Sequence, residues 1–154
     1  MTTKVSEPKP SKDGPWTTRV VKRDRKFYGE LRSYNRGRLN VYWAHRRTDE
    51  YFRADESWAI DVDTINVLKA YRVTHVGILV EDGTKLLAPI ELFGPDGKLR
   101  GVTVRNYSKH VGAKGKTGEL QWYVPEKLFV MRRPPEDLRE ETLIERMHIA
   151  KGRR

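Results

Sequence analysis

The stretch TTRVVKRDRKFYGELRSYNRGRLNVYW, residues 17–43, predicts three consecutive strands in the N-terminal part of the chain. Residues 17–22 are rich in β-branched side chains, and residues 26–32 and 39–43 alternate apolar with polar side chains, as half-buried strands do. Charged residues, asparagine and glycine separate the three segments and favour tight turns. We therefore expect a three-strand antiparallel meander whose two turns carry cations.

A second antiparallel unit is predicted around Asp82-Gly83, a dipeptide typical of a hairpin turn. Residues 74–81 and 84–93 flank this turn and place apolar side chains at alternate positions. A further turn of Gly, Pro and Asp leads into a third expected strand over residues 98–105. The centre of the chain is thus predicted to form a three-strand antiparallel sheet.

Two helices are expected in addition to the strands. Asp61 or Asp63 can cap a short central helix that runs to about Tyr71, since the apolar residues between them repeat at helical spacing. Pro134 and the acidic residues after it favour the start of a C-terminal helix, whose apolar stripe ends near Gly152.

These elements define an α+β protein with mainly antiparallel strands, namely an N-terminal meander and a central hairpin sheet, together with the two helices. Two more strands are expected over residues 120–124 and 128–131. Residues 1–15 are polar and proline-rich and are predicted to be a flexible arm. Residues 16–150 are expected to form a single α+β domain, and residues 151–154 a basic tail.

The composition excludes several classes of protein. The chain has 154 residues, no cysteine and a net charge of +10, so neither a disulfide framework nor cysteine-ligated zinc can form. No run of eighteen apolar residues occurs, and the N-terminus lacks the apolar region of a secretion signal. We therefore expect a cytoplasmic protein that does not insert into a membrane.

The positive charge is concentrated in two zones. Residues 19–53 hold eleven Lys and Arg residues against four acids, a local net charge of +7, and they also hold seven of the fifteen aromatic residues. Residues 98–118 carry +6, and the segment between these zones is acidic. Cations neutralise phosphates and flat rings stack on bases, so the pattern predicts a nucleic-acid-binding surface. DNA and RNA both fit it, and the rings slightly favour a single strand over a duplex.

The candidate contacts are the cations of the two zones and the tyrosines that strand alternation, or a neighbouring turn, places away from the apolar side chains. The same alternation assigns Phe27 to the apolar side of its strand, with Gly29 and Leu31. The predicted nucleic-acid-binding residues are Lys22, Arg23, Arg25, Lys26, Tyr28, Tyr34, Arg36, Arg38, Tyr42, Arg46, Arg47, Lys109, Lys114 and Lys116.

We expect no catalytic residue, metal site or cofactor, because no complete catalytic motif is present. The glycine- and lysine-rich segment 110–117 resembles the end of a phosphate-binding P-loop but lacks its first glycine and leads into a strand. Two alternatives stay open. The acids between Asp55 and Asp63 could hold Mg²⁺ in a nuclease, with His45 as a base. The protein could instead be an interaction adaptor of a phage or mobile element that binds a protein partner through the C-terminal helix.

Overall fold

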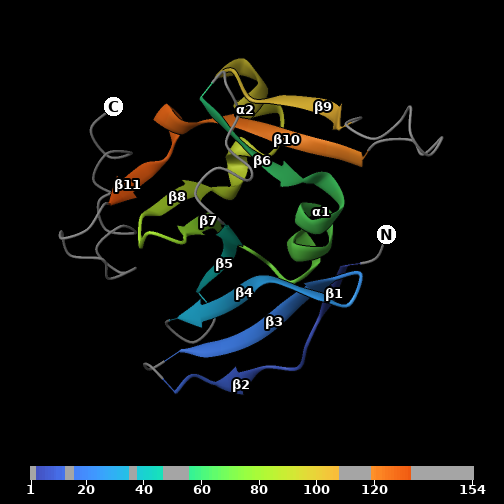
Figure 1. Cartoon of the computed structure of the whole chain (residues 1–154), viewed down its shortest axis with the longest axis vertical. Coiled ribbons are helices and arrows are strands. Elements are labelled where there is room, and N and C mark those ends of the chain that lie inside the picture. The colour runs from blue at the N-terminus through green and yellow to red at the C-terminus, as the bar shows by residue number, and fades with distance from the viewer. Residues whose placement is uncertain (1–2, 13–15, 35–37, 47–55, 108–118, 133–154) are drawn as a thin grey trace.

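The computed structural model describes residues 3–12, 16–34, 38–46, 56–107 and 119–132 (Figure 1). Most of these residues lie in strands and few in helices, so the fold is mainly β within a broad α+β class. The elements in chain order are β1 (Thr3–Val5), β2 (Lys9–Pro10), β3 (Thr17–Arg23), β4 (Lys26–Tyr34), β5 (Leu39–Arg46), β6 (Ser57–Asp61), α1 (Val62–Ala70), β7 (His75–Val80), β8 (Lys85–Pro89), η2 (Ile90–Leu92), α2 (Pro95–Leu99), β9 (Thr103–Tyr107), β10 (Glu119–Pro125), η3 (Glu126–Leu128) and β11 (Val130–Arg132).

The larger of the two sheets is mixed and has the strand order β1-β3-β4-β5-β7-β8-β11, with β2 also beside β3. The antiparallel pairs β3–β4 and β4–β5 confirm the predicted meander, and the antiparallel pair β7–β8 confirms the hairpin. Between them, β5 and β7 run parallel. Parallel neighbours need a long crossover, which here includes β6 and α1. The two units that we predicted separately are therefore halves of one sheet.

The N-terminal residues contribute strands to this sheet. Thr3 pairs with Arg23 and Val5 with Val21, while Lys9 pairs with Thr18, all in antiparallel register. Much of the segment predicted as a flexible arm is thus paired along β3 in the described residues. Without β1 and β2, this edge of β3 would be open, and the pairing satisfies its backbone hydrogen-bonding groups.

The predicted third strand of the hairpin sheet is wrong in its start and in its partner. Residues 95–99 form helix α2, and β9 pairs with β10, which in turn pairs with β6 in a separate three-stranded sheet. Pro95 and Asp96 occupy the first turn of α2, where proline and acids are favoured. Gly97 packs against the Leu92 backbone with no room for a Cβ atom. The turn residues therefore begin a helix instead of a hairpin.

The remaining predictions of secondary structure divide into three cases. Strand β10 confirms the prediction over residues 120–124, and α1 confirms the central helix between Asp61 and Tyr71. Asp61 occupies the N-cap position, but its side chain makes no capping hydrogen bond. Residues 126–128 form a short 3₁₀ turn, so the last strand, β11, starts only at Val130. The predicted C-terminal helix lies outside the described residues.

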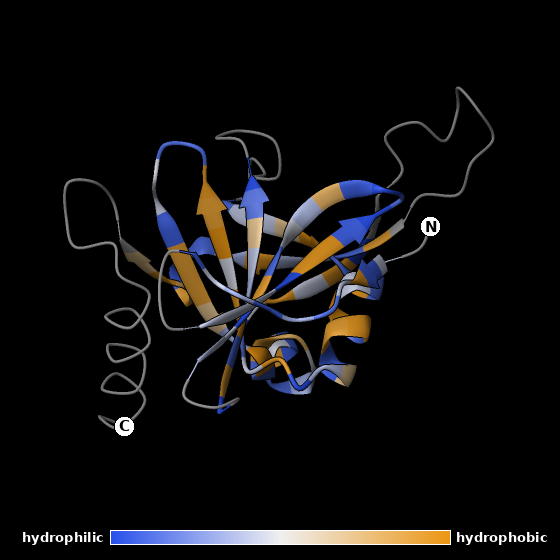
Figure 2. Ribbon diagram, turned by 90° about the horizontal axis from the view of Figure 1, so that it is seen from below, coloured by the Kyte–Doolittle hydropathy of each residue, from blue (hydrophilic) through white to orange (hydrophobic). Residues whose placement is uncertain are grey.

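The main core lies on one face of the larger sheet, under α1 and the three-stranded sheet. It joins Tyr42 and Ile78 of the large sheet to Ile65 of α1 and Trp122 of β10. The other face carries a smaller cluster around Trp43. Figure 2 shows hydrophobic residues along the strands and on α1, and hydrophilic residues at the turns. Because both faces of β5 are covered, Tyr42 is fully buried, and the prediction that it faces outward is wrong.

A β-bulge changes the direction of the side chains at the start of β4. Val21 pairs with Gly29 but Lys22 pairs with Phe27, so Tyr28 is the extra residue. Gly29 is the residue at which a close backbone approach is needed, since a Cβ there would overlap the Trp43 carbonyl oxygen of the neighbouring strand. The bulge puts Tyr28 on the same side as Gly29 and Phe27 on the opposite side, which the simple alternation predicted incorrectly.

Candidate functional site

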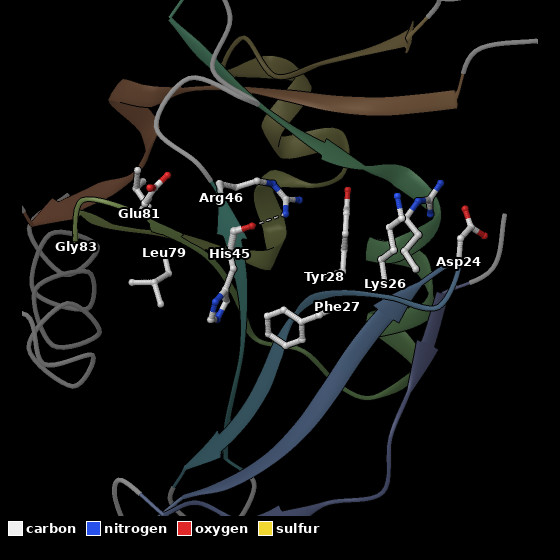
Figure 3. Close-up of a pocket in the computed structure, with 11 residues that line it drawn as sticks. Asp24, Lys26, Phe27, Tyr28, His45, Arg46, Leu79, Glu81 and Gly83 are labelled. Carbon is white, nitrogen blue, oxygen red and sulfur yellow. Dashed lines mark hydrogen bonds between the residues drawn. The ribbon is translucent and has the colours of Figure 1, made fainter.

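A cleft of about 910 Å³ opens between the β3–β4 turn and the β7–β8 turn, at the ends of β5 and β7 (Figure 3). Cationic, aromatic and acidic side chains line it together. The lining residues are Arg23, Asp24, Lys26, Phe27, Tyr28, His45, Arg46, Leu79, Val80, Glu81 and Gly83. The volume lies in the range typical of small-molecule and cofactor sites. This cleft is the candidate functional site of the described residues.

The β3–β4 turn forms one side of the cleft and has an unusual backbone. Asp24 and Arg25 have φ values of 50° and 70°, the left-handed region that glycine and asparagine favour. Two such residues in succession are typical of the tight hairpin turn that matches the twist of its strands. A left-handed arginine costs roughly 1–2 kcal/mol relative to the ordinary conformation. The turn keeps Arg25 at this cost and exposes it beside Lys22 and Lys26.

An exposed aromatic ring lies next to this basic turn. Phe27 is 50% exposed, although large apolar side chains are usually buried. The Phe27 and His45 rings pack in a T-shaped arrangement, with a centroid distance of 5.0 Å and an interplanar angle of 85°. A ring that has one neighbour of this kind and remains half exposed leaves part of its surface open to a ligand. The bulge produces this exposure, because it moves Phe27 away from the core face.

Tyr28 points to the other side and is engaged by protein groups. The Arg46 guanidinium lies 4.4 Å from the centre of the Tyr28 ring, a cation–π arrangement, and Arg46 also donates to the His45 carbonyl oxygen at 3.0 Å. The Tyr28 hydroxyl donates a hydrogen bond to Asp61. One ring face and the hydroxyl of Tyr28 are therefore occupied, and Phe27 is the better stacking surface of the two.

The buried end of the site is a network of charged and polar groups around Asp61. Arg23 forms an ion pair with Asp63 and lies 3.9 Å from the Asp61 carboxylate. Gln121 of β10 donates to Asp61 at 3.1 Å, from the second sheet. Asp61 is 2% exposed, and such a carboxylate needs partners of this kind. We assign the network a structural role, since it connects both sheets and α1.

This network also bears on the nuclease alternative. Asp61 and Asp63 both contact Arg23, so a cation already occupies the place that Mg²⁺ would take. Glu56 is exposed, and Asp55 lies outside the described residues. Within the described parts of the chain, no group of three or more His, Asp or Glu side chains is placed to hold a metal ion. The described residues therefore offer no observation in favour of the nuclease.

The opposite side of the cleft is acidic. Glu81 and Asp82 are both exposed at the β7–β8 turn. Asp82 accepts a hydrogen bond from the Thr84 amide at 2.8 Å and so supports the turn, in which Gly83 has a φ of 93°. The Glu81 amide donates to the Arg46 carbonyl oxygen at 2.9 Å, which fixes its backbone to the end of β5. Among the described residues, no cation pairs with the Glu81 carboxylate.

His45 lies between these two sides and is half-buried. Partial burial lowers its pKa below the ordinary value of 6.5, because an imidazolium ion loses hydration there. Arg32 and Arg46 lower the pKa further, and Glu30 opposes them. The imidazole is consequently neutral at pH 7, and it serves as an aromatic neighbour of Phe27 rather than as a cation for phosphate.

The structure separates the predicted contact residues into three sets. Lys22, Arg25 and Lys26 are exposed together at the β3–β4 turn, while Arg38 is exposed at the far end of β5. The remaining described members are buried or half-buried and contact protein groups: Arg23, Tyr28, Tyr34, Tyr42 and Arg46. The members outside the described residues are Arg36, Arg47, Lys109, Lys114 and Lys116.

Sequence reasoning missed three residues of the site. Lys4 is exposed and pairs across the sheet with Lys22, which adds a cation beside the turn. Phe27 was assigned to the core, although Gly29 inside a strand is a signal for a bulge that could have corrected this. No sequence pattern could have placed Glu81 at the site, because its position near the basic turn depends on the parallel pairing of β5 with β7.

Comparison of the chain with protein-family models, with curated proteins and with solved structures finds no match. In the described residues, no helix combines the length and apolar character that crossing a membrane would require. The candidate function therefore depends on the chemistry of the cleft and its basic turn.

Proposed function

We propose that this protein binds single-stranded nucleic acid in the cytoplasm, without catalysis, through the β3–β4 turn and the adjoining cleft. The observation that carries the proposal is the half-exposed Phe27 ring at the base of a turn with three exposed cations, Lys22, Arg25 and Lys26. Proteins that bind single strands combine such basic surfaces with rings on which bases stack. Lys4 extends the basic surface by one strand, since it pairs with Lys22.

A single strand fits this surface better than a duplex. Stacking on Phe27 requires a base whose face is accessible, and bases inside a duplex are already stacked. The described helices present few basic residues: α1 has Lys69 and α2 has Lys98. Neither resembles a recognition helix that enters a major groove with several basic and amide side chains.

The left-handed Arg25 supports the proposal independently of the charge count. Glycine would adopt the same backbone without strain, so turn geometry does not favour an arginine at this position. Strained residues of this kind gather at functional sites. A guanidinium at the tip of an exposed turn is well placed to contact phosphate in a bidentate manner.

The test is the salt dependence of binding to a fluorescent single-stranded oligonucleotide. If Lys4, Lys22, Arg25 and Lys26 each meet a phosphate, log K against log salt has a slope of about −3. The double variant R25Q/K26Q is expected to make the slope shallower by roughly 1.4 and to weaken binding. The matched control R100Q/K127Q removes two exposed charges elsewhere and leaves the slope unchanged. A wild-type slope shallower than about −1 contradicts the proposal.

A further inference from the structure

The two sides of the cleft differ in charge, and an aromatic ring lies between them. Figure 3 places Lys26 and Asp24 on one side, Glu81 and Gly83 on the other, and Phe27 with His45 in the middle. Beyond the lining residues, Arg25 and Lys22 add to the basic side. A ligand that combines an anionic group, a flat ring and hydrogen-bond donors would complement these groups.

The Glu81 carboxylate determines which end of such a ligand faces it. An ionised carboxylate only accepts hydrogen bonds, and it repels phosphate. Phosphate is therefore directed to Arg25 and Lys26, and the edge of the base to Glu81. Among the described residues no side chain pairs with Glu81, so its oxygens are available to a donor on the ligand.

Nucleobases differ at the edge that would meet a carboxylate. Cytosine carries an exocyclic amino group that donates to Glu or Asp, whereas uracil and thymine carry a carbonyl oxygen at the same ring position. A carbonyl oxygen opposite a carboxylate places two acceptors together. Cytosine and uracil have nearly the same size, so the volume of the cleft cannot discriminate between them. The Glu81 carboxylate can, because it accepts hydrogen bonds only.

We infer that the cleft binds one nucleobase with an exocyclic amino group, such as cytosine, and discriminates against uracil and thymine. The base stacks on Phe27, its amino group donates to Glu81, and its phosphate lies at Arg25 and Lys26. This inference rests on the proposed function and adds a base preference to it. The volume of about 910 Å³ is sufficient for one nucleotide with water.

The experiment compares dC12 with dU12, each labelled at the 5′ end, by fluorescence anisotropy at pH 7.5 and fixed salt. The full-length wild-type protein is expected to bind dC12 about tenfold more tightly than dU12. Glu81→Gln is expected to bring this ratio close to one, because an amide accepts from cytosine and donates to uracil equally well. Removing the negative charge of Glu81 affects the affinity for both oligonucleotides alike, so the ratio of the two affinities is free of this general effect.

Glu91→Gln is the matched control, since Glu91 is also an exposed acid but lies in η2, away from the cleft. It should keep the wild-type ratio. Equal wild-type affinities for dC12 and dU12 would overturn the base preference and leave the proposed function standing. A preference that survives in Glu81→Gln would overturn the assignment to Glu81. No binding of either oligonucleotide would overturn this inference together with the proposed function.

Discussion

The Tyr28 hydroxyl donates a hydrogen bond to the buried Asp61 carboxylate and so connects the bulged strand of the large sheet to the start of α1. Gln121 donates to the same carboxylate from the second sheet. On the other side, the Tyr28 ring supports the Arg46 guanidinium at the cleft. A single tyrosine therefore joins the architecture of the protein to its candidate binding site.

Tyr28→Phe is expected to destabilise the protein by about 1.5–3 kcal/mol, because it removes a hydrogen bond to a buried charged group. The ring and its contact with Arg46 are retained. Urea unfolding followed by tryptophan fluorescence measures the change. Tyr71→Phe is the control, since Tyr71 is 37% exposed, and it should change the free energy of unfolding very little. Equal effects of the two substitutions would contradict the role of the Tyr28–Asp61 contact.

Phe27→Ala is expected to weaken binding of single-stranded DNA by about 1–3 kcal/mol through lost base stacking. The free energy of unfolding should change much less, since half of the side chain is already exposed. Tyr71→Ala removes another exposed ring, at the end of α1, and should leave binding unchanged. If Phe27→Ala retained wild-type affinity, Phe27 would not be the stacking surface.

Arg25→Gly is expected to stabilise the fold and to weaken nucleic-acid binding at the same time. Glycine relieves the left-handed strain at this position, which should raise the free energy of unfolding by roughly 0.5–1 kcal/mol. Arg25→Gln removes the same charge without relieving the strain, so it should weaken binding with no gain in stability. Thermal unfolding measures the stability of both variants, and anisotropy titrations measure their binding. A loss of stability in Arg25→Gly would contradict the claim that the left-handed backbone at Arg25 is strained.

Stability is expected to depend on pH through His45. Burial lowers the pKa of His45 in the folded state below 6.5, so the folded protein binds fewer protons than the unfolded chain in the interval beneath pH 6.5. The free energy of unfolding should therefore fall as the pH decreases from 7.5 through this interval. His45→Gln cannot titrate and should show a flatter profile between pH 7.5 and 5.5. Parallel profiles for the two proteins would exclude His45 as the cause.

Gly77→Ala is expected to destabilise the fold by about 1–3 kcal/mol, because the Trp43 ring lies over Gly77 and leaves no room for a methyl group. Gly94→Ala is a suitable control. Its backbone is extended, and the nearest atom to an added Cβ would be the Glu91 carbonyl oxygen at 3.8 Å. Denaturant unfolding of both variants checks the contrast, and a neutral Gly77→Ala would show that Trp43 can move.

Local patterns in the sequence were sufficient for several elements. The alternation in residues 17–43 predicts β3, β4 and β5, and the dipeptide Asp82-Gly83 predicts the β7–β8 hairpin. In both cases the neighbours that determine the conformation lie within a few residues along the chain. Turn chemistry and side-chain periodicity act at this range, and they can be recognised without a structure. The predicted helix α1 starts after Asp61, but this side chain binds Tyr28, Gln121 and Arg23 instead of capping the helix.

The composition of the site follows from contacts between distant residues. Arg23 was predicted to face phosphate, but Asp61 and Asp63 bind it in the interior; Tyr42 was predicted to face outward, but the second layer covers it. The bulge exposes Phe27, and the parallel pairing of β5 with β7 brings Glu81 to the cleft. Local sequence patterns indicated most strands of the large sheet and the zones rich in positive charge, but not β1, β2 or β6. Which of these charges and rings remain exposed could be seen only in the folded chain, because burial depends on partners from other strands.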